Sequence, residues 1–368
     1  MILMTKSAYI HIPFCNKICS YCDFSKFYNY KEFIDKYLIS LEKEIKSIYK
    51  GEVLDTIYIG GGTPTVLEIN DLEKLLKILT IFNKSKSIEY TIESNIDTLS
   101  KEKLDLLKKY NINIISIGIE TTNNKLLKLL NRDLNKKHLE EMINYSKTIG
   151  IDNINLDLIY ALPGEKMIDL KKDLEYITSL NPKHISTYSL IIEEHTVLNN
   201  LKYKNIDEEL DLKMYNYICN YLKEKGYIHY EISNFSKPCY ESKHNLVYWN
   251  NNTYYGFGIG ASSYIDNKRI TNTRSLNKYF NNNYIKEEEL LKKDDIIDYE
   301  IILNLRLKDG IDLKLFKDKY NINLKDIYNY DELVNNKLLI LNNNHLYIPE
   351  DKLYISNTII VKLLDKRI

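Results

Sequence analysis

Three cysteines near the start of the chain have the type and the spacing for metal chemistry. Cys15, Cys19 and Cys22 form a C-x3-C-x2-C motif. A cubane iron–sulfur cluster normally takes four thiolates, so three protein ligands leave one iron open to another molecule. An open position also distinguishes catalytic metal sites from closed structural ones. The motif therefore predicts a [4Fe–4S] cluster with one exchangeable position.

The alternative interpretation is a set of buried thiols, or part of a small zinc site. The sequence nearby holds no second C-x2-C or H-x3-H pair that would complete a zinc site. His11 is the nearest other ligand type, and we expect it to lie along a strand at Ala8–Pro13 and not to reach the metal. The cysteines would then lie on the loop after this strand, at the end of a sheet.

The segment Tyr9-Ile-His-Ile-Pro-Phe-Cys, followed by the remaining cysteines, resembles the opening of radical S-adenosylmethionine (SAM) proteins. The resemblance is to the branch that contains oxygen-independent coproporphyrinogen III oxidase and the HemW haem chaperones, and it covers essentially the whole chain. In that superfamily the amino and carboxylate groups of SAM chelate the open iron, and an electron from the cluster breaks the sulfonium bond. The resemblance thus implies SAM as a second cofactor.

Composition limits the partners and the compartment. Lys+Arg and Asp+Glu both number 51, so net charge gives no reason to expect nucleic acid as a partner. Only five cysteines occur, which argues against a disulfide framework and for a reducing compartment. No targeting peptide fits before the cysteine motif, and no apolar run has membrane-spanning length. We therefore expect a cytoplasmic protein; peripheral membrane contact and a homodimer are both compatible with the sequence.

Strand-like and helix-like segments alternate along the first half of the chain. Six segments rich in Ile, Val and Tyr are each followed by a helical pattern. This alternation predicts an α/β fold, a parallel barrel whose chemistry lies at the carboxyl ends of the strands. The resemblance implies the partial (β/α)6 barrel of radical SAM proteins. The predicted strands are Ala8–Pro13, Thr56–Gly60, Ile88–Glu93, Ile112–Ile119, Asp152–Tyr160 and His184–Leu190. The first helix should bury a stripe of Phe33, Tyr37, Leu38, Leu41 and Ile45.

The fifth predicted strand alternates apolar and polar residues, although a parallel strand buried on both faces is usually apolar throughout. If its Ile and Leu residues pack under the helices, Asn155 and Asp157 point into the barrel. A carboxylate there is costly unless it meets a polar ligand. The pattern predicts an occupied interior.

Polar and glycine residues also mark the other strand ends. Gly60-Gly61-Gly62-Thr63 follows the second strand and would let a ligand approach the backbone closely. The resemblance assigns SAM contacts to Tyr9, Tyr21, Gly61, Gly62, Thr63, Glu93, Glu120, Arg132 and Asp157. Relatives usually have Gln where this chain has Glu120, and a carboxylate still accepts from a ribose hydroxyl but lacks the amide donor.

A second motif, H-N-x-x-Y-W, is formed by His244, Tyr248 and Trp249. On a helix, His244 and Tyr248 would share one face. Imidazole is a common axial ligand of haem iron, and aromatic faces can cover a porphyrin. From the residues alone, a structural histidine beside core aromatics fits as well. The resemblance to HemW, where the motif is associated with haem binding, favours haem contact.

The chain should divide into a barrel (1–230), an extension with the H-N-x-x-Y-W motif (231–295) and a small winged-helix-like domain (296–368). Tyr299–Gly310 is typical of a helix ended by glycine. Winged helices often bind DNA, but the chain lacks a basic excess, so we assign this domain to packing, haem transfer or partner contact.

The resemblance implies a HemW-like haem chaperone that carries haem, a cluster and SAM, and delivers haem to haem-dependent respiratory proteins. Phe24 stands where the resembled coproporphyrinogen oxidase has a further cysteine, so that oxidase activity is not expected. Two enzymatic alternatives remain open. One is oxidative decarboxylation of a porphyrinogen, and the other is methyl or alkyl transfer on the same scaffold.

Overall fold

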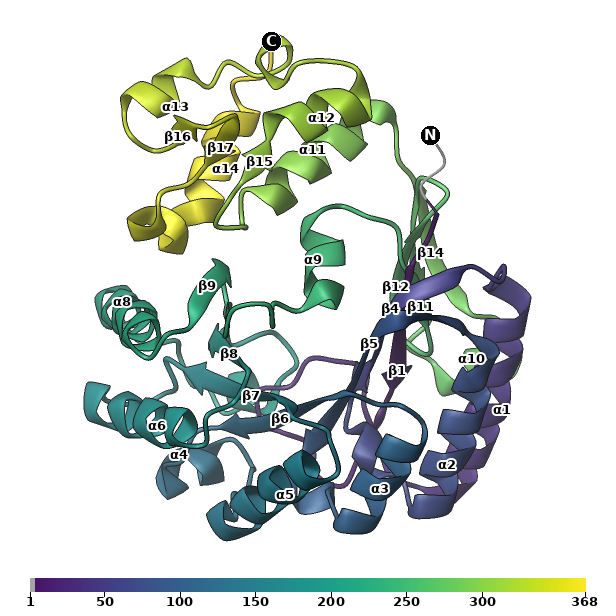
Figure 1. Cartoon of the computed structure of the whole chain (residues 1–368). Coiled ribbons are helices and arrows are strands. Elements are labelled where there is room, and N and C mark those ends of the chain that lie inside the picture. Colours follow the sequence, from purple (N-terminus) through teal and green to yellow (C-terminus); the bar gives the residue numbers. More distant parts are fainter. Residues whose placement is uncertain (1–3) are drawn as a thin grey trace. The chain divides into compact units, whose positions relative to one another are not determined.

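The computed structural model describes residues 4–368, and these fall into two compact units (Figure 1). The first unit extends to Met214 and also contains Thr253–Leu290. The second contains Tyr215–Asn252 and Leu291–Ile368. The predicted extension, 231–295, is therefore shared between the two units.

All six predicted strands are present in the first unit, and each lies within a few residues of its expected bounds. They pair in parallel in the order β1-β4-β5-β6-β7-β8, which is the partial barrel that the sequence predicts. Parallel pairing brings the carboxyl ends of these strands to one edge. The strands are β1 (Ser7–Ile12), β4 (Val53–Gly61), β5 (Asn83–Asn95), β6 (Ile114–Glu120), β7 (Asn153–Tyr160) and β8 (His184–Ser189).

A seventh parallel strand, β11 (Tyr255–Phe257), pairs with β1 at the sheet edge, with Ala8 opposite Tyr255. The sequence did not indicate it, because three residues with a central glycine show no strand period. This pairing brings Thr253–Leu290 into the first unit. The same segment forms an antiparallel sheet of β12 (Ser262–Ile265), β13 (Lys268–Asn272) and β14 (Ile285–Leu290), with α10 (Leu276–Phe280).

Helices cover the outer side of this sheet (Figure 1). The buried stripe of α1 contains Tyr37, Leu38, Leu41 and Ile45 as predicted, with Ile34 in place of the partly buried Phe33. Glu44 also lies on this buried face, where it accepts hydrogen bonds from the Gly258 amide and the Tyr279 hydroxyl. The helices are α1 (Lys31–Ile48), α2 (Ile69–Ile78), α3 (Lys101–Lys109), α4 (Asn124–Leu129), α5 (Lys136–Thr148), α6 (Met167–Ser179), α7 (Val197–Asn200) and α8 (Glu208–Glu224), the last of which continues into the second unit.

The second unit combines helices with short antiparallel strands. The predicted helix at Tyr299–Gly310 begins earlier, at Lys293, and ends at Asn304; Gly310 instead closes a turn by donating its amide to the Leu307 carbonyl. A three-stranded sheet in the order β15-β17-β16 follows, as expected for a small winged-helix-like domain. The elements are β9 (Ile228–Glu231), β10 (Asn234–Ser236), α9 (Lys243–Trp249), α11 (Lys293–Asn304), β15 (Ile311–Asp312), α12 (Leu313–Tyr320), α13 (Asp331–Asn335), β16 (Ile340–Asn342), β17 (His345–Tyr347) and α14 (Ser356–Leu364).

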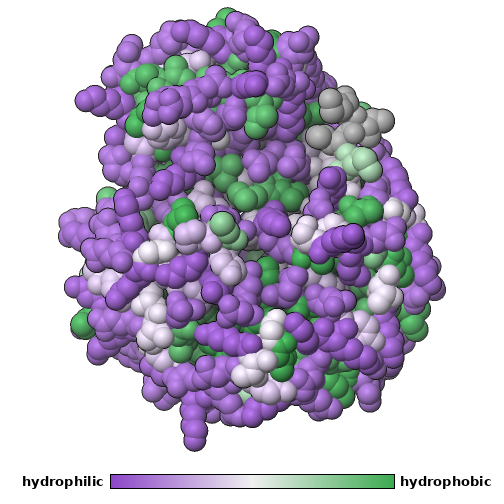
Figure 2. All heavy atoms as spheres, viewed as in Figure 1, coloured by the Kyte–Doolittle hydropathy of each residue, from purple (hydrophilic) through white to green (hydrophobic). Residues whose placement is uncertain are grey.

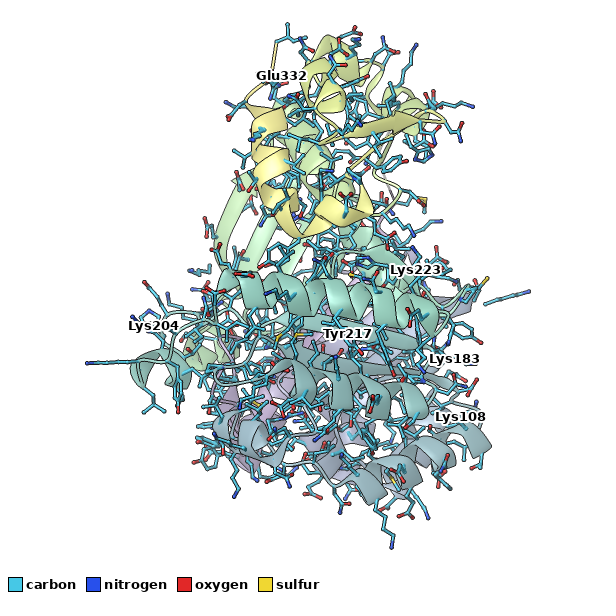
Figure 3. All side chains as sticks on the ribbon, turned by 90° about the vertical axis from the view of Figure 1, so that its left-hand side faces the viewer. Lys108, Lys183, Lys204, Tyr217, Lys223 and Glu332 are labelled. Atoms are coloured by element: carbon cyan, nitrogen blue, oxygen red, sulfur yellow. The ribbon has the colours of Figure 1, made fainter. Side chains whose placement is uncertain are left out.

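The surface is mostly polar on the face shown in Figure 2, where apolar residues form small separate patches. Lysines are spread over the first unit: Lys204 extends well apart from Lys108 and Lys183 in Figure 3. No helix among residues 4–368 combines the length and the apolar composition that crossing a bilayer requires.

Candidate metal and cofactor site

The cysteine loop begins directly after β1 and is fixed to the sheet at several points. Cys15 lies in the short strand β2 (Phe14–Cys15), which pairs with β3 (Phe27–Tyr28), so the loop with Cys19 and Cys22 starts and returns at one place. The Thr63 amide donates to the Phe14 carbonyl at 2.8 Å, and the Ser20 amide donates to the Leu130 carbonyl at 3.1 Å. These bonds position the three thiols at the carboxyl ends of the strands.

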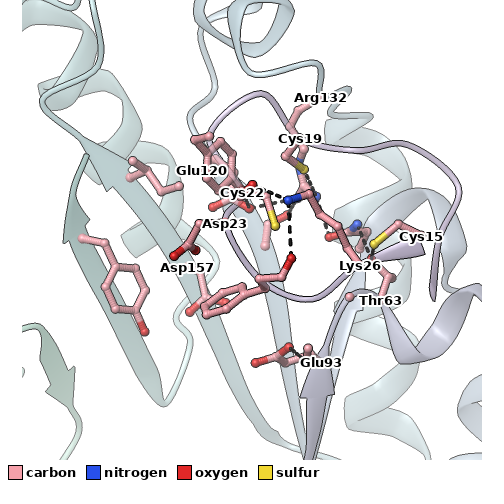
Figure 4. Close-up of a pocket in the computed structure, with 18 of the residues that line it drawn as sticks. Cys15, Cys19, Cys22, Asp23, Lys26, Thr63, Glu93, Glu120, Arg132 and Asp157 are labelled. Carbon is pink, nitrogen blue, oxygen red and sulfur yellow. Dashed lines mark hydrogen bonds and ion pairs between the residues drawn. The ribbon is translucent and has the colours of Figure 1, made fainter. Parts of the chain in front are cut away.

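All three thiols line one cavity of about 500 Å³ within the first unit (Figure 4). The Thr63 hydroxyl lies 3.9 Å from Cys15 Sγ, and Arg132 Nη1 lies 3.9 Å from Cys19 Sγ. Such donors stabilise thiolates. Burial, in contrast, raises the pKa of the Cys15 thiol to about 11 and also raises the pKa values of Cys19 and Cys22. Binding of a metal cluster here would therefore release protons.

The donor set fits an iron–sulfur cluster. Among residues 4–368, no three His, Cys, Asp or Glu side chains converge on the position of a single metal ion. A cluster does not need such convergence, because each of its irons takes one thiolate. Cys15, Cys19 and Cys22 could hold three irons of such a cluster, which would supply an electron for reductive chemistry.

His11 does not take part in this donor set. Its Nε2 is hydrogen-bonded to the Ser25 carbonyl at 2.8 Å, and its Nδ1 lies 2.9 Å from the Tyr9 hydroxyl. Burial lowers the pKa of His11 to about 4, so the ring is neutral at physiological pH. As expected from the sequence, His11 lies along β1 and not at the metal position.

Two glycines bring the backbone of the β4 end close to the cluster position. Gly61 has φ +113°, and a Cβ on it would lie 2.5 Å from the His11 ring. A Cβ on Gly62 would lie 2.7 Å from the Phe14 carbonyl oxygen and 3.0 Å from Cys15 Sγ. A side chain at Gly62 would therefore displace the start of the cysteine loop, and one at Gly61 would displace the His11 ring, which explains why this segment is rich in glycine.

Two carboxyl groups, one on β5 and one on β7, line the cavity and are held by neutral donors. Glu93 accepts from the Tyr58 hydroxyl and the Gly61 amide, each at 2.9 Å. Asp157 accepts from Ser116 at 3.0 Å and from Asn155 at 2.7 Å. Burial raises the pKa of Glu93 to about 7 and also raises the pKa of Asp157. Asn155 and Asp157 thus face the barrel interior, as the alternation of β7 predicts.

A third carboxyl group forms the buried ion pair of the site. Glu120 Oε1 lies 3.1 Å from Arg132 Nη2 and accepts from the Tyr21 hydroxyl at 3.0 Å. Arg132 also donates to Asn95 Oδ1 at 2.6 Å and to the Gly118 carbonyl at 2.7 Å. Most of its hydrogen-bonding capacity is therefore used within the protein. Figure 4 shows Arg132 linked to Glu120, with Asp157 and Glu93 also lining the same space.

The structure gathers nearly all of the residues that the resemblance assigned to the cluster and SAM. Those lining the cavity are Cys15, Cys19, Tyr21, Cys22, Gly61, Gly62, Thr63, Glu93, Glu120, Arg132 and Asp157. Tyr9 is not among them; its ring packs on Tyr58, with 6.2 Å between centroids.

Sequence reasoning missed Tyr58 and Asn95, which also line the cavity. Asn95 links Arg132 to the Thr63 hydroxyl, to which it donates at 2.9 Å. The signal was present, because Asn95 lies two residues after Glu93 and so on the same strand face. Tyr58 gave no such signal, since an aromatic residue in an apolar strand is ordinarily part of the core.

The H-N-x-x-Y-W motif lies in the second unit, on α9. His244 and Tyr248 share one helix face as predicted, and His244 Nε2 lies 2.8 Å from the Tyr248 hydroxyl. His244 is 1% exposed, and burial lowers its pKa to about 3. The carbonyl of Trp249 accepts from Asn304 at 2.8 Å, and the Arg306 guanidinium lies 5.8 Å from the Trp249 ring. The neutral imidazole has the protonation state that an iron ligand needs, but one of its nitrogens is already hydrogen-bonded.

Comparison with known proteins agrees with this architecture. Residues 9–177 match the model of the radical SAM superfamily, and residues 291–351 match that of the HemN C-terminal domain. The fold matches coproporphyrinogen III oxidase (HemN) from Escherichia coli with a TM-score of 0.84, over 97% of this chain and 89% of that one. Sequence identity to HemN is 22%, so this likeness concerns the fold alone.

Fold and cavity together define the class, a radical SAM protein with a HemN-type C-terminal domain. The sequence is 38% identical to the heme chaperone HemW of Lactococcus lactis over 99% of this chain and 98% of that protein. It is 39% identical to the heme chaperone HemW of Bacillus subtilis, over 88% and 89% of the two chains. The chain belongs to the HemW family.

Proposed function

We propose that this protein is a cytoplasmic haem chaperone. It binds a [4Fe–4S] cluster through Cys15, Cys19 and Cys22, binds SAM at the open iron, and carries haem beside His244. It delivers this haem to haem-dependent respiratory proteins. The observation that carries the proposal is the presence of two separate ligand sets, three thiols around a cavity and a neutral imidazole in an aromatic motif.

The first ligand set supports SAM binding in the cavity. Glu93 and Asp157 present carboxyl oxygens that accept hydrogen bonds, as ribose hydroxyls and an ammonium group require. The glycines after β4 allow a ligand to approach the backbone. The family resemblance assigns Tyr9 to SAM as well, but Tyr9 does not line the cavity. It packs against Tyr58 and contacts His11, so it would support SAM binding indirectly, through these neighbours.

The second ligand set supports haem binding. His244 is neutral and lies on one helix face with Tyr248, and Trp249 adds a large aromatic surface. Both relatives described above are named heme chaperones, and together they match nearly the whole chain. For iron to reach Nε2 of His244, the hydrogen bond to Tyr248 must break, so haem binding would include a local rearrangement of α9.

The rival function is that of an enzyme acting on a porphyrinogen. Phe24, the residue in place of the further cysteine, lines the mouth of the cavity and is 62% exposed. A phenyl ring there provides neither a thiol nor a proton. This observation favours the chaperone, and anaerobic conversion of coproporphyrinogen III in the presence of SAM and a reductant tests the rival directly.

A haem titration of anaerobically reconstituted protein tests the proposal. Wild type, His244→Ala and His229→Ala are compared at equal cluster content by absorbance in the Soret region. His229 is a matched control, because it is buried in the same unit and its ring stacks on Phe235 with 4.3 Å between centroids. We expect saturable one-to-one binding that weakens at least about tenfold only in His244→Ala, through loss of an axial ligand.

Two results would overturn this assignment. Wild type with an intact cluster that shows no saturable haem binding would exclude the chaperone function. Equal losses in both histidine variants would mean that His244 contributes through packing and not as a ligand.

A further inference from the structure

Carboxyl groups outnumber cationic side chains in the lining of the cavity of the first unit. Five carboxyl groups and three cationic side chains line it, and in its buried part Glu93, Glu120 and Asp157 face the single guanidinium of Arg132. Glu93 and Asp157 are held by neutral donors only. A ligand that brings a positive charge would therefore be stabilised here, while a neutral ligand of the same shape would not.

Glu120 is the one of these three carboxyl groups that pairs with Arg132, and it does so through only one of its two oxygens. It is 6% exposed, and both of its donors, Tyr21 and Arg132, bind the same oxygen, Oε1. Among residues 4–368, nothing donates to Oε2. The backbone of Glu120 has φ +63°, a left-handed conformation that is uncommon for a residue with a side chain.

Gly118, two residues before Glu120 on β6, leaves space for this arrangement. A Cβ on Gly118 would lie 2.7 Å from Glu120 Oε1 and 2.8 Å from Arg132 Nη2. Backbone conformation and the absence of a side chain at Gly118 thus combine to hold a carboxyl group at the cavity wall (Figure 4).

We infer that Glu120 determines specificity by charge: it selects a sulfonium ligand over the neutral thioether or other uncharged products that share its adenosyl group. This inference rests on the proposed function, because it takes SAM as the ligand of the cavity. Glutamine at this position would keep the acceptor for Tyr21 and Arg132 but present an uncharged amide in place of Oε2. Glu120→Gln is therefore nearly isosteric and removes mainly the charge.

The test is equilibrium binding of three ligands to cluster-loaded protein. SAM carries a sulfonium, sinefungin carries an amine at the same place, and S-adenosylhomocysteine carries a neutral thioether. We expect wild type to prefer the two cationic ligands. Glu120→Gln should lower the ratio of the affinity for SAM to that for S-adenosylhomocysteine by about tenfold or more, since opposite charges attract strongly in a buried site. Glu287→Gln, on the exposed strand β14, makes the same change in net charge and should keep the wild-type ratio.

Several outcomes separate the possibilities. Equal affinity of wild type for SAM and S-adenosylhomocysteine, or an unchanged ratio in Glu120→Gln, would overturn the inference while leaving SAM binding intact. Failure of cluster-loaded wild type to bind SAM would instead contradict the cofactor assignment in the proposed function. If Glu120→Gln does not retain its cluster, Glu120→Asp provides the second test, because it keeps the charge and should keep the preference for cations even if all affinities fall.

Discussion

The cysteine loop of the first unit and the His244–Tyr248 pair of the second present their ligands in opposite ways. Cys15, Cys19 and Cys22 line an open cavity, and glycines keep side chains away from it. His244 is buried and hydrogen-bonded to its own helix. Under the proposed function, a cluster would bind thiols that already line a cavity, whereas haem would have to replace the hydrogen bond between His244 and Tyr248. The proposed cofactors would therefore require no rearrangement of the thiols in the first unit, but a local rearrangement around His244 in the second.

Removal of one thiol should give the largest effect and should be confined to the first unit. We expect Cys19→Ala to lower bound iron from about four per chain to nearly none, because two thiolates cannot retain the cluster. Iron and sulfide analysis after anaerobic reconstitution measures this, with the exposed Cys239→Ala in the second unit as control.

The same variant tests whether the two regions are independent. Cys19→Ala should bind haem within about twofold of wild type, since its change lies outside the second unit. Loss of haem binding together with the cluster would show that the haem site depends on the first region and that the two regions are not independent.

Sequence patterns revealed the first region more fully than the second. The cysteine motif is local, so its spacing alone indicated the metal. Asp157 was indicated by the alternation of its strand, and Glu93 and Glu120 were assigned by the family resemblance; all three come together because parallel strands end at one edge. The hydrogen bond between His244 and Tyr248 follows from helical spacing, but the burial of His244 depends on packing that no local pattern encodes.

Other features were not accessible from the sequence for physical reasons. Glu44 lies on the buried face of α1, where a single carboxylate in the sequence would be expected to face solvent. The structure shows that Gly258 and Tyr279, more than 200 positions away, donate hydrogen bonds to it. Strand β11 is too short to show a period, and only its pairing with β1 identifies it. Both cases depend on long-range contacts.

The stability of the second unit should depend on pH through the buried imidazole of His244. Burial lowers its pKa from 6.5 to about 3, so between these values the unfolded chain binds a proton that the folded protein does not. Stability from this group is therefore complete above about pH 6.5 and is lost as pH falls, by roughly 2 kcal/mol at pH 5. Glutamine cannot titrate in this range. Between pH 7 and pH 5, the unfolding free energy of His244→Gln should therefore fall by roughly 2 kcal/mol less than that of wild type.

Urea unfolding followed by the fluorescence of Trp249, the only tryptophan, measures this in the second unit. His345→Gln is the control, because it removes a partly exposed imidazole from the same unit. An identical pH dependence in wild type and His244→Gln would mean that His244 is not held neutral, and that the second region is as open as the first.

The smallest expected effect comes from removing the hydroxyl group that haem iron would have to displace from His244. Tyr248→Phe keeps the ring beside His244 but removes the hydroxyl 2.8 Å from Nε2. A neutral hydrogen bond is worth about 1 kcal/mol, so the unfolding free energy should fall by about that amount and haem affinity should rise about fivefold, because iron no longer competes with the hydroxyl. Tyr347→Phe is the control, since its hydroxyl has no hydrogen bond to the described part of the chain. Weaker haem binding in Tyr248→Phe would show that the hydroxyl assists binding, and the second region would then be preformed like the first.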